Sequence, residues 1–222
     1  VHSLAILSPP TIPASSYFYP PCRSVQDIGI EVRAFPIPKI NSFQYVLDLG
    51  SGGGIDCFVA AEKTGSLGRV IGVDMTPRMV SSARENAKKL SASNITFKRG
   101  HMEQIPQDET SVDLVISNNA IALSEWKHVT LSEMYRVLKP GGRFVISERV
   151  VIEALPENIQ DSTHEWVEGV AGAADKERFL TMIETAGFVG VEVLEERADT
   201  GGDEEWRSSL ATLTILANKP AG

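Results

Sequence analysis

A glycine-rich segment that begins with an acidic residue is the strongest chemical signal in the sequence. Asp48-Leu49-Gly50-Ser51-Gly52-Gly53-Gly54 follows a short apolar run and precedes a segment with helical spacing. Glycines at such a junction permit positive φ and close approach of the backbone to a ligand. The following helix adds unpaired N–H groups at its N-terminus. A glycine-rich turn without a ligand is the plain alternative, but the strand–loop–helix context favours a nucleotide-binding loop.

A second acidic residue, Asp74, ends the next predicted strand about 20 residues beyond the glycines, where a carboxylate can accept hydrogen bonds from ribose hydroxyls. Capping of the next helix is the alternative, but Thr76 suits that role. The glycine spacing differs from the dinucleotide pattern G-x-G-x-x-G, and no Gly-Lys-Ser/Thr follows. Because Asp48 is unfavourable beside phosphates and favourable beside a cation, we expect S-adenosylmethionine as the cofactor, with its sulfonium and ammonium charges.

Alternating strands and helices position these residues. The apolar patterns predict strands at 45–49, 69–73, 94–98, 112–117, 143–151, 189–196 and 210–216, and helices at 55–63, 77–90, 128–138 and 175–186. Lys139-Pro140-Gly141-Gly142 is interpreted as a breaker cluster after the third helix. This alternation predicts βαβ units, and therefore a parallel sheet with helices on both faces.

Three further stretches complete a set of five ordered motifs. They are Gly100-His101-Met102-Glu103-Gln104-Ile105-Pro106, Asp113-Leu114-Val115-Ile116-Ser117-Asn118 and Leu138-Lys139-Pro140-Gly141-Gly142. With the glycine loop and the acidic strand end, they resemble the class I S-adenosylmethionine-dependent methyltransferases over residues 45–218. The resemblance implies an enzyme of that class. It also implies a Rossmann-like, doubly wound α/β fold, in which a seven-stranded, mostly parallel sheet has an antiparallel last strand.

The resemblance assigns roles to single residues around the cofactor. The methionine part is expected against Gly50, Gly52 and Gly54, with Asp48 beside its charges and Asn118 near its end. Asp74 is expected on the ribose, and the adenine is expected beside Met75, Met102 and Glu103. Met75 and Met102 can also be plain core residues. Many relatives carry an acidic residue after Gly100, where this chain has His101, so we expect the adenine amine to be recognised differently.

One branch of the family is more similar still. Residues 48–58, 71–77 and 154–159 resemble arsenite methyltransferases, which bind trivalent arsenic through thiolates because both partners are soft. The family has Ser-Asn-Cys and Trp-x-x-Cys, whereas this chain has Ser117-Asn118-Asn119 and Trp166-Val167-Glu168-Gly169. Cys57 matches a family thiol, although a small core residue explains it better. Cys22 lies in an unrelated proline-rich context.

We therefore predict an intact cofactor site beside a changed acceptor pocket. Ligands of open α/β sheets collect beyond the carboxyl ends of the strands. The pocket candidates at that edge are Asn119, Glu148, Arg149, His164, Trp166 and Glu168. Asn119, Glu148 and His164 are the catalytic candidates, since a carboxylate or imidazole can act as general base. A solvent-facing position is the alternative for His164.

Trp126 and His128 are weaker candidates after the fourth strand, and Glu125 and Lys127 are predicted to form an ordinary solvated face. The main functional hypothesis is methylation of a small organic acceptor at O, N or C, in the setting of secondary metabolism. The first alternative is a methyltransferase-like protein that binds the cofactor but catalyses a cyclisation or isomerisation. The second alternative is residual arsenite methylation through Cys57, Cys22 and an external thiol.

Composition limits the partners. The chain has 21 Lys and Arg and 29 Asp and Glu, a net charge of −8, which argues against a general nucleic-acid binder. Two cysteines cannot form a disulfide scaffold or a four-cysteine zinc site, and no metal-ligand spacing is present, so no metal is predicted. Neither an apolar run of about 18 residues nor a secretion signal is found. We predict a cytoplasmic protein without membrane partners, and no oligomeric state is predicted.

The sequence divides into two regions. Residues 1–43 hold seven of the twelve prolines and are predicted to form an irregular N-terminal arm, with a partly disordered tail as the alternative. Phe18 or Tyr19 of this arm, together with Trp166, is expected to wall an apolar acceptor pocket. Residues 44–222, in which strands and helices alternate, are predicted to form the S-adenosylmethionine-binding methyltransferase domain.

Overall fold

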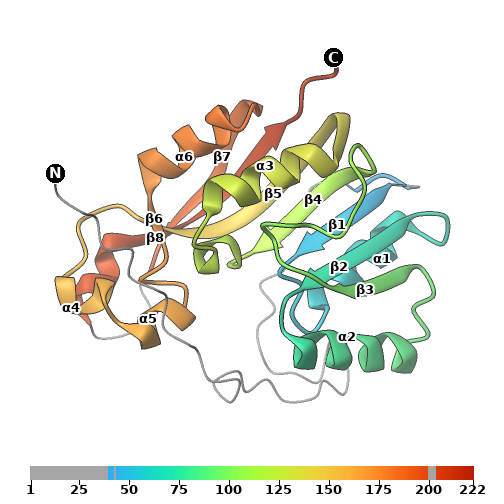
Figure 1. Ribbon diagram of the computed structural model, residues 1–222, viewed down its shortest axis with the longest axis horizontal. Coiled ribbons are helices and arrows are strands. Elements are labelled where there is room, and N and C mark those ends of the chain that lie inside the picture. The colour runs from blue at the N-terminus through green and yellow to red at the C-terminus, as the bar shows by residue number, and fades with distance from the viewer. Residues whose placement is uncertain (1–39, 43, 200–203) are drawn as a thin grey trace, which may run out of the picture.

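The computed structural model describes residues 40–42, 44–199 and 204–222 (Figure 1). Residues 1–39, and with them Phe18, Tyr19 and Cys22, lie outside the described part of the chain. The predictions of an arm, of its contribution to the pocket and of a domain boundary at residue 43 therefore stay predictions.

The described chain is an α/β structure with one large sheet. Its strands are β1 (Tyr45–Leu49), β2 (Arg69–Asp74), β3 (Ile95–Arg99), β4 (Val112–Asn118), β5 (Leu138–Val151), β6 (Ala174–Asp175), β7 (Val189–Ala198) and β8 (Leu210–Asn218). Its helices are α1 (Ile55–Thr64), α2 (Pro77–Lys89), α3 (Lys127–Val137), α4 (Glu157–Gln160), α5 (Thr163–Val167) and α6 (Lys176–Thr185), with single 3-10 turns η1 (Ile121–Leu123) and η2 (Glu205–Ser209). Each predicted strand and helix is present, with ends shifted by a few residues.

The strand order is β3-β2-β1-β4-β5-β8-β7, and the two-residue β6 pairs with β5. The pairs from β3 to β5 are parallel, whereas β8 is antiparallel to both β5 and β7. This order confirms the predicted doubly wound sheet with its antiparallel last strand. The small β6 is an addition that the apolar pattern did not indicate.

Helices cover both faces of the sheet. Figure 1 shows α3 and α6 on one side and α1 and α2 on the other. Neighbouring residues of β1 serve the two layers, since Leu47 packs into the α3–α6 core and Val46 into the α1–α2 core, both fully buried. Burial on both faces explains why this strand is continuously apolar.

Two local predictions need correction. Residues 139–142 do not form a separate breaker turn but begin β5, with Gly141 at a φ of 74°. A register shift between Val112 and Leu114 accommodates them in the pairing of β4 and β5. Thr76 is the N-cap of α2 as predicted, but its side chain makes no capping hydrogen bond.

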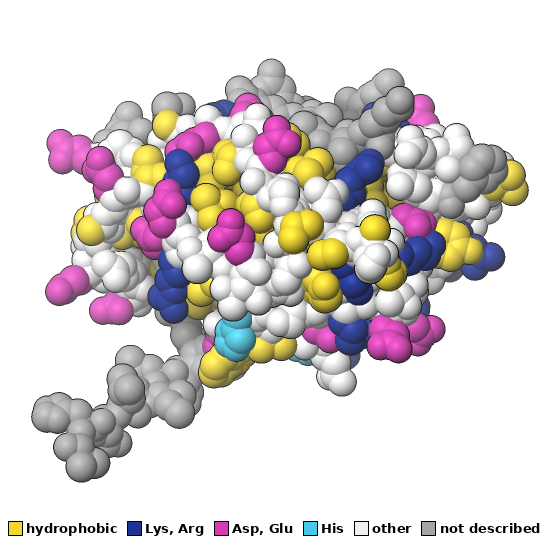
Figure 2. Space-filling model, turned by 90° about the horizontal axis from the view of Figure 1, so that it is seen from above, with side chains coloured by type: hydrophobic (Ala, Val, Ile, Leu, Met, Phe, Trp, Pro, Cys, Tyr) yellow, Lys and Arg dark blue, Asp and Glu magenta, His cyan; other side chains and the backbone are white. Residues whose placement is uncertain are grey.

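Surface charge and helix length bear on whether nucleic acid or a membrane is a partner. On the face shown in Figure 2, acidic and basic side chains of the described residues are interspersed with apolar ones, and no broad basic patch gathers there. None of the helices in the described ranges has both the length and the apolar character that a bilayer crossing requires.

Candidate active site

A cavity of about 550 Å³ opens at the carboxyl ends of the parallel strands. The end of β1, the end of β2 and the end of β4 meet at this edge because these strands are parallel neighbours. Arg149, near the carboxyl end of β5, and the end of α5 complete the wall. The predicted site residues that line the cavity are Gly50, Gly52, Asp74, Met75, Met102, Glu103, Asn118, Asn119, Arg149, Trp166 and Glu168.

The glycine loop is fastened to the neighbouring strand by its backbone. The N–H groups of Gly50 and Ser51 donate to the Val73 carbonyl oxygen at 2.8 and 3.0 Å. Gly50 has a φ of 76°, and a Cβ atom placed on it would lie 2.2 Å from the Cβ of Ala120. Gly52 has a φ of 51° and faces open space. The first position therefore requires glycine for packing, and the second leaves the backbone accessible to a ligand.

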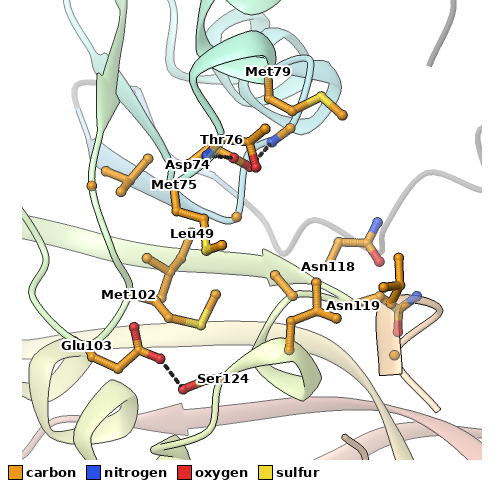
Figure 3. Close-up of a pocket in the computed structure, with 18 of the residues that line it drawn as sticks. Leu49, Asp74, Met75, Thr76, Met79, Met102, Glu103, Asn118, Asn119 and Ser124 are labelled. Carbon is orange, nitrogen blue, oxygen red and sulfur yellow. Dashed lines mark hydrogen bonds between the residues drawn. The ribbon is translucent and has the colours of Figure 1, made fainter. Parts of the chain in front are cut away.

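Asp74 joins the loop to the start of α2. One carboxylate oxygen accepts a hydrogen bond from the Gly52 N–H at 2.9 Å, and the other accepts from the Thr76 N–H at 2.8 Å (Figure 3). Each carboxylate oxygen has a second lone pair, and Asp74 lies on the cavity wall. The carboxylate is thus fixed in place with acceptor capacity left for hydroxyl groups of a ligand.

The side chains beyond Asp74 give the cavity an apolar region. Figure 3 shows Met75 and Met102 extending into the same part of the cavity beside Leu49. Met75 is 53% exposed although it is apolar, which favours a ligand-facing role over a core role. Glu103 accepts a hydrogen bond from the Ser124 hydroxyl at 2.5 Å, so its orientation is fixed at the same wall.

Two residues assigned to the cofactor lie elsewhere. Asp48 is only 2% exposed and accepts a hydrogen bond from the Cys57 thiol at 3.1 Å, behind the loop. Burial, reinforced by the charge of Asp56, raises the pKa of Asp48 to about 8, so the group is mostly neutral at pH 7. Gly54 packs against the Phe97 ring, where a Cβ would approach within 2.6 Å. Neither residue lines the cavity.

Glu148 does not face the cavity either. It is 1% exposed, and its carboxylate accepts hydrogen bonds from the N–H groups of Ala120, Ile121 and Ala122 at 3.1, 3.0 and 3.2 Å. Burial raises its pKa, while the three N–H groups and the charge of Lys127 act in the opposite direction. Because its oxygens are bonded within the fold, the predicted general-base role does not fit this geometry.

His164 points to solvent. Its side chain is 80% exposed, and its nearest charged neighbour is the Glu165 carboxylate at 4.0 Å. The solvent-facing alternative is therefore the better description of this histidine. Of the three catalytic candidates, only Asn119 lines the cavity.

The acceptor end of the cavity combines residues from three segments. Asn118 ends β4 and Asn119 follows it; both project into the cavity (Figure 3), and Asn119 has a φ of 50°. Arg149 of β5 donates to the Glu168 carbonyl oxygen at 2.7 Å, which connects the sheet to the end of α5. Trp166 supplies the aromatic part of this wall.

The structure places the positions at which arsenite methyltransferases carry thiols in two different surroundings. Asn119 and Gly169 both line the cavity. Cys57, in contrast, is fully buried, and burial next to Asp48 raises its thiol pKa well above the ordinary value. Among the described residues, no thiol reaches the acceptor end of the cavity.

Sequence reasoning missed the role of Lys127. This side chain was expected in solvent, but its ammonium group donates to the carbonyl oxygens of Ala122 and Ser124 at 3.1 and 2.7 Å. It also lies 5.9 Å from the centre of the Trp166 ring. A lysine at the start of an amphipathic helix carries no signal that would distinguish this position from a solvated one. Trp126, a weaker candidate, is 56% exposed.

A parallel sheet, a glycine loop at its carboxyl edge and a carboxylate at the next strand end define a Rossmann-like protein that binds a nucleoside-containing cofactor. Comparison with known proteins narrows this class. A family described as "Methyltransferase domain" matches residues 40–187 of the chain. The chain therefore belongs to the class I S-adenosylmethionine-dependent methyltransferase family, as the five motifs predicted, and S-adenosylmethionine is the cofactor of that family.

Individual relatives refine the position within the family. An arsenite methyltransferase of Halobacterium salinarum is 41% identical over 182 residues, which are 79% of this chain and 46% of that protein. A demethylmenaquinone methyltransferase of Lactococcus lactis is 35% identical over 103 residues, 46% of this chain and 41% of that protein. The chain thus spans about half the length of the curated relatives it matches.

Among solved structures, an arsenic(III) S-adenosylmethionine methyltransferase from Chlamydomonas reinhardtii has a TM-score of 0.77 and 34% identity. That similarity covers 89% of this chain and 72% of the Chlamydomonas chain. It confirms the Rossmann-like methyltransferase fold.

Proposed function

We propose that this chain catalyses methyl transfer from S-adenosylmethionine to a small organic acceptor. The observation that carries the proposal is the chemistry of the acceptor end. Asn119 and Gly169 stand where the resemblance to arsenite methyltransferases calls for thiolates, and both line the cavity. An amide and a hydrogen atom are poor ligands for soft arsenic but are compatible with an organic molecule.

The cofactor half of the cavity suits S-adenosylmethionine. Gly52 leaves open space beside the loop, Asp74 offers acceptors for ribose hydroxyls, and Met75 and Met102 offer apolar surface for the adenine. When bound, the cofactor supplies an electrophilic methyl group. The protein's own contribution is to hold the acceptor in line and close to that methyl group, which can account for several powers of ten in rate.

The acceptor half favours a small molecule with an aromatic or otherwise flat part. Trp166 presents its indole, and Asn119 and Arg149 present polar groups on the same wall. Glu168 is an exposed carboxylate at this end, so it takes the place of Glu148 and His164 as the candidate proton acceptor. The hypothesis of a cyclase or isomerase relied on Glu148 or His164 as acid or base, and neither residue lines the cavity.

Arsenite methylation is the second candidate, because 41% identity to the Halobacterium enzyme favours it. It would have to use Cys57, Cys22 or an external thiol. Cys57 is fully buried and bonded to Asp48, and Cys22 lies outside the described residues.

The test begins with calorimetric titration of the purified chain with S-adenosylhomocysteine, which is expected to bind. Tritiated S-adenosylmethionine is then supplied with arsenite and glutathione in one arm. A demethylated naphthoquinol, a catechol, an aromatic thiol and a primary amine form the organic arm. We expect label in an organic product and none in arsenic species. Label in arsenic species that is lost on Cys57→Ser would overturn the choice of acceptor, and failure to bind S-adenosylhomocysteine would overturn the proposal as a whole.

A further inference from the structure

The turn at residues 120–124, between β4 and α3, touches both halves of the cavity. Ala120 packs so closely on the cofactor loop that a Cβ on Gly50 would lie 2.2 Å from its Cβ. Likewise, a Cβ placed on Gly172 would lie 2.2 Å from the carbonyl oxygen of Ala122. Gly172 follows the α5 segment that carries Trp166. The turn therefore sets the spacing between the cofactor loop and the acceptor wall.

The Glu148 carboxylate holds this turn by accepting hydrogen bonds from the turn's backbone N–H groups. Three consecutive backbone N–H groups, those of Ala120, Ile121 and Ala122, point at one fully buried carboxylate. The Ser117 hydroxyl adds a fourth, longer contact at 3.4 Å. Three N–H donors converging on a carboxylate form a strong charge-assisted contact, so the turn can move only if this contact breaks.

The Lys127 ammonium group holds the same turn by donating hydrogen bonds to the turn's backbone carbonyl groups. Its ammonium group donates to the carbonyl oxygens of Ala122 and Ser124, and the Trp166 ring lies beside it. The charged groups that face it are Glu148 of β5, Glu103 after β3 and Arg178 of α6. Burial lowers the pKa of Lys127 to about 8, and Arg178 adds to this effect against the two carboxylates.

We propose that Glu148 and Lys127 are positioning residues, which fix the 120–124 turn and thereby align the acceptor wall with the cofactor while touching neither ligand. The inference rests on the proposed function, because alignment matters only if two bound molecules must react. It gives Glu148 a role that differs from the general base expected for it. Methyl transfer should be sensitive to this alignment, since small misplacements of reacting groups cost large factors in rate.

The first experiment compares Glu148→Gln with the wild-type chain and with Glu153→Gln, an exposed glutamate just beyond β5. Amide hydrogen exchange of residues 120–122 and the affinity for S-adenosylhomocysteine are measured on the same samples. We expect these amides to exchange at least tenfold faster in Glu148→Gln, because one oxygen and the negative charge are lost, while the affinity changes less than about threefold. Glu153→Gln should match the wild type in both.

Two outcomes overturn the inference at Glu148. One is unchanged exchange of the three amides, which would mean that the carboxylate does not fix the turn. The other is a loss of affinity in proportion to the faster exchange, which would make Glu148 part of the cofactor site. If the wild type binds no S-adenosylhomocysteine, the proposed function fails, but the exchange data still decide whether the turn is fixed by Glu148.

The second experiment uses a signal that a merely structural lysine would not produce. The chain is labelled with 5-fluorotryptophan, and the fluorine resonance of Trp166 is assigned with Trp166→Phe and followed from pH 6 to pH 9.5. We expect a transition near pH 8 in the wild type, as Lys127 loses a proton and with it the positive charge beside the Trp166 ring. Lys127→Arg should lack this transition because a guanidinium keeps its charge.

Two matched variants keep the result interpretable. Lys139→Arg, at the amino end of β5 and bonded to Asp113, should retain the transition. Asp48→Asn should also retain it, which separates Lys127 from Asp48, whose pKa burial raises to about 8 as well. A transition that persists in Lys127→Arg, or that disappears in Asp48→Asn, would overturn the role of Lys127.

Discussion

The two halves of the cavity are built in different ways. The cofactor half is built around a backbone loop, which its N–H groups tie to Val73 and to Asp74, and side chains after β2 and β3 are added to it. The acceptor half is made of side chains from separate segments, such as Asn119 after β4, Arg149 of β5 and Trp166 of α5. A site built from backbone requires glycine or another particular residue at a few positions. In a site built from side chains, a single substitution can change which ligand fits.

The groups behind the two halves differ in the same way. Asp48 and Cys57 form a buried pair behind the cofactor loop, and burial keeps both mostly uncharged at neutral pH. Glu148 and Lys127, behind the acceptor half, hold their turn through charge-assisted hydrogen bonds to backbone groups. A neutral buried pair thus lies behind the cofactor loop and charged anchors lie behind the acceptor half, and the two sets of groups can be perturbed separately.

The largest effect is expected from Gly50→Ala. The new methyl group would overlap Ala120, and a φ of 76° is unfavourable for alanine by about 1 kcal/mol or more. We expect the affinity for S-adenosylhomocysteine to fall about 100-fold or further, measured by calorimetry with circular dichroism to verify folding. Gly53→Ala, where a Cβ meets nothing within 4 Å, is the control in the same loop and should bind nearly as the wild type does. Equal losses in both variants would contradict the backbone-built description.

Asp74→Ala tests the polar part of the same half. The substitution removes the acceptor for the Gly52 and Thr76 N–H groups and the oxygens offered to a ribose. We expect about a 30-fold weaker affinity for S-adenosylhomocysteine, corresponding to about 2 kcal/mol. Asp74→Asn keeps one carbonyl oxygen and should lose only severalfold. If the alanine variant binds normally, the carboxylate does not contribute to cofactor binding.

These two variants concern the part of the site that the sequence motif predicts and that lies on the cavity wall. The motif predicts that Gly50, Gly52 and Asp74 lie together, and the structure places all three on the cavity wall, because two neighbouring parallel strands end at the same edge of the sheet. Glu148, His164 and Lys127 could not be placed in this way. A strand residue near the carboxyl edge can face the cavity or the neighbouring turn, and only the packing of η1 on β5 decides which. The exposure of His164 and the burial of Lys127 likewise depend on how α5 and α3 dock.

Asp48→Asn tests the packing behind the loop through the pH dependence of stability. A raised pKa means that below about pH 4 the carboxyl is protonated in both states and costs nothing. Between about pH 4 and 8 only the unfolded chain ionises, so the free energy of unfolding falls as pH rises. We expect Asp48→Asn to flatten this decline by up to about 1.4 kcal/mol per pH unit between pH 5 and pH 8, measured by urea unfolding. An unchanged slope would show that Asp48 is not titrating in this range.

The smallest expected effect is also the one that separates the halves most cleanly. Trp166→Ala removes an aromatic wall of the acceptor end, while the loop and Asp74 stay intact. For the organic acceptor labelled in the tritium assay, we expect kcat/KM to fall about fivefold, or about 1 kcal/mol, with the affinity for S-adenosylhomocysteine within twofold. Trp126→Ala is the matched control, because Trp126 is 56% exposed and lies off the cavity. If Trp166→Ala weakened cofactor binding as much as catalysis, the two halves would be energetically one site, coupled through the 120–124 turn that contacts both of them.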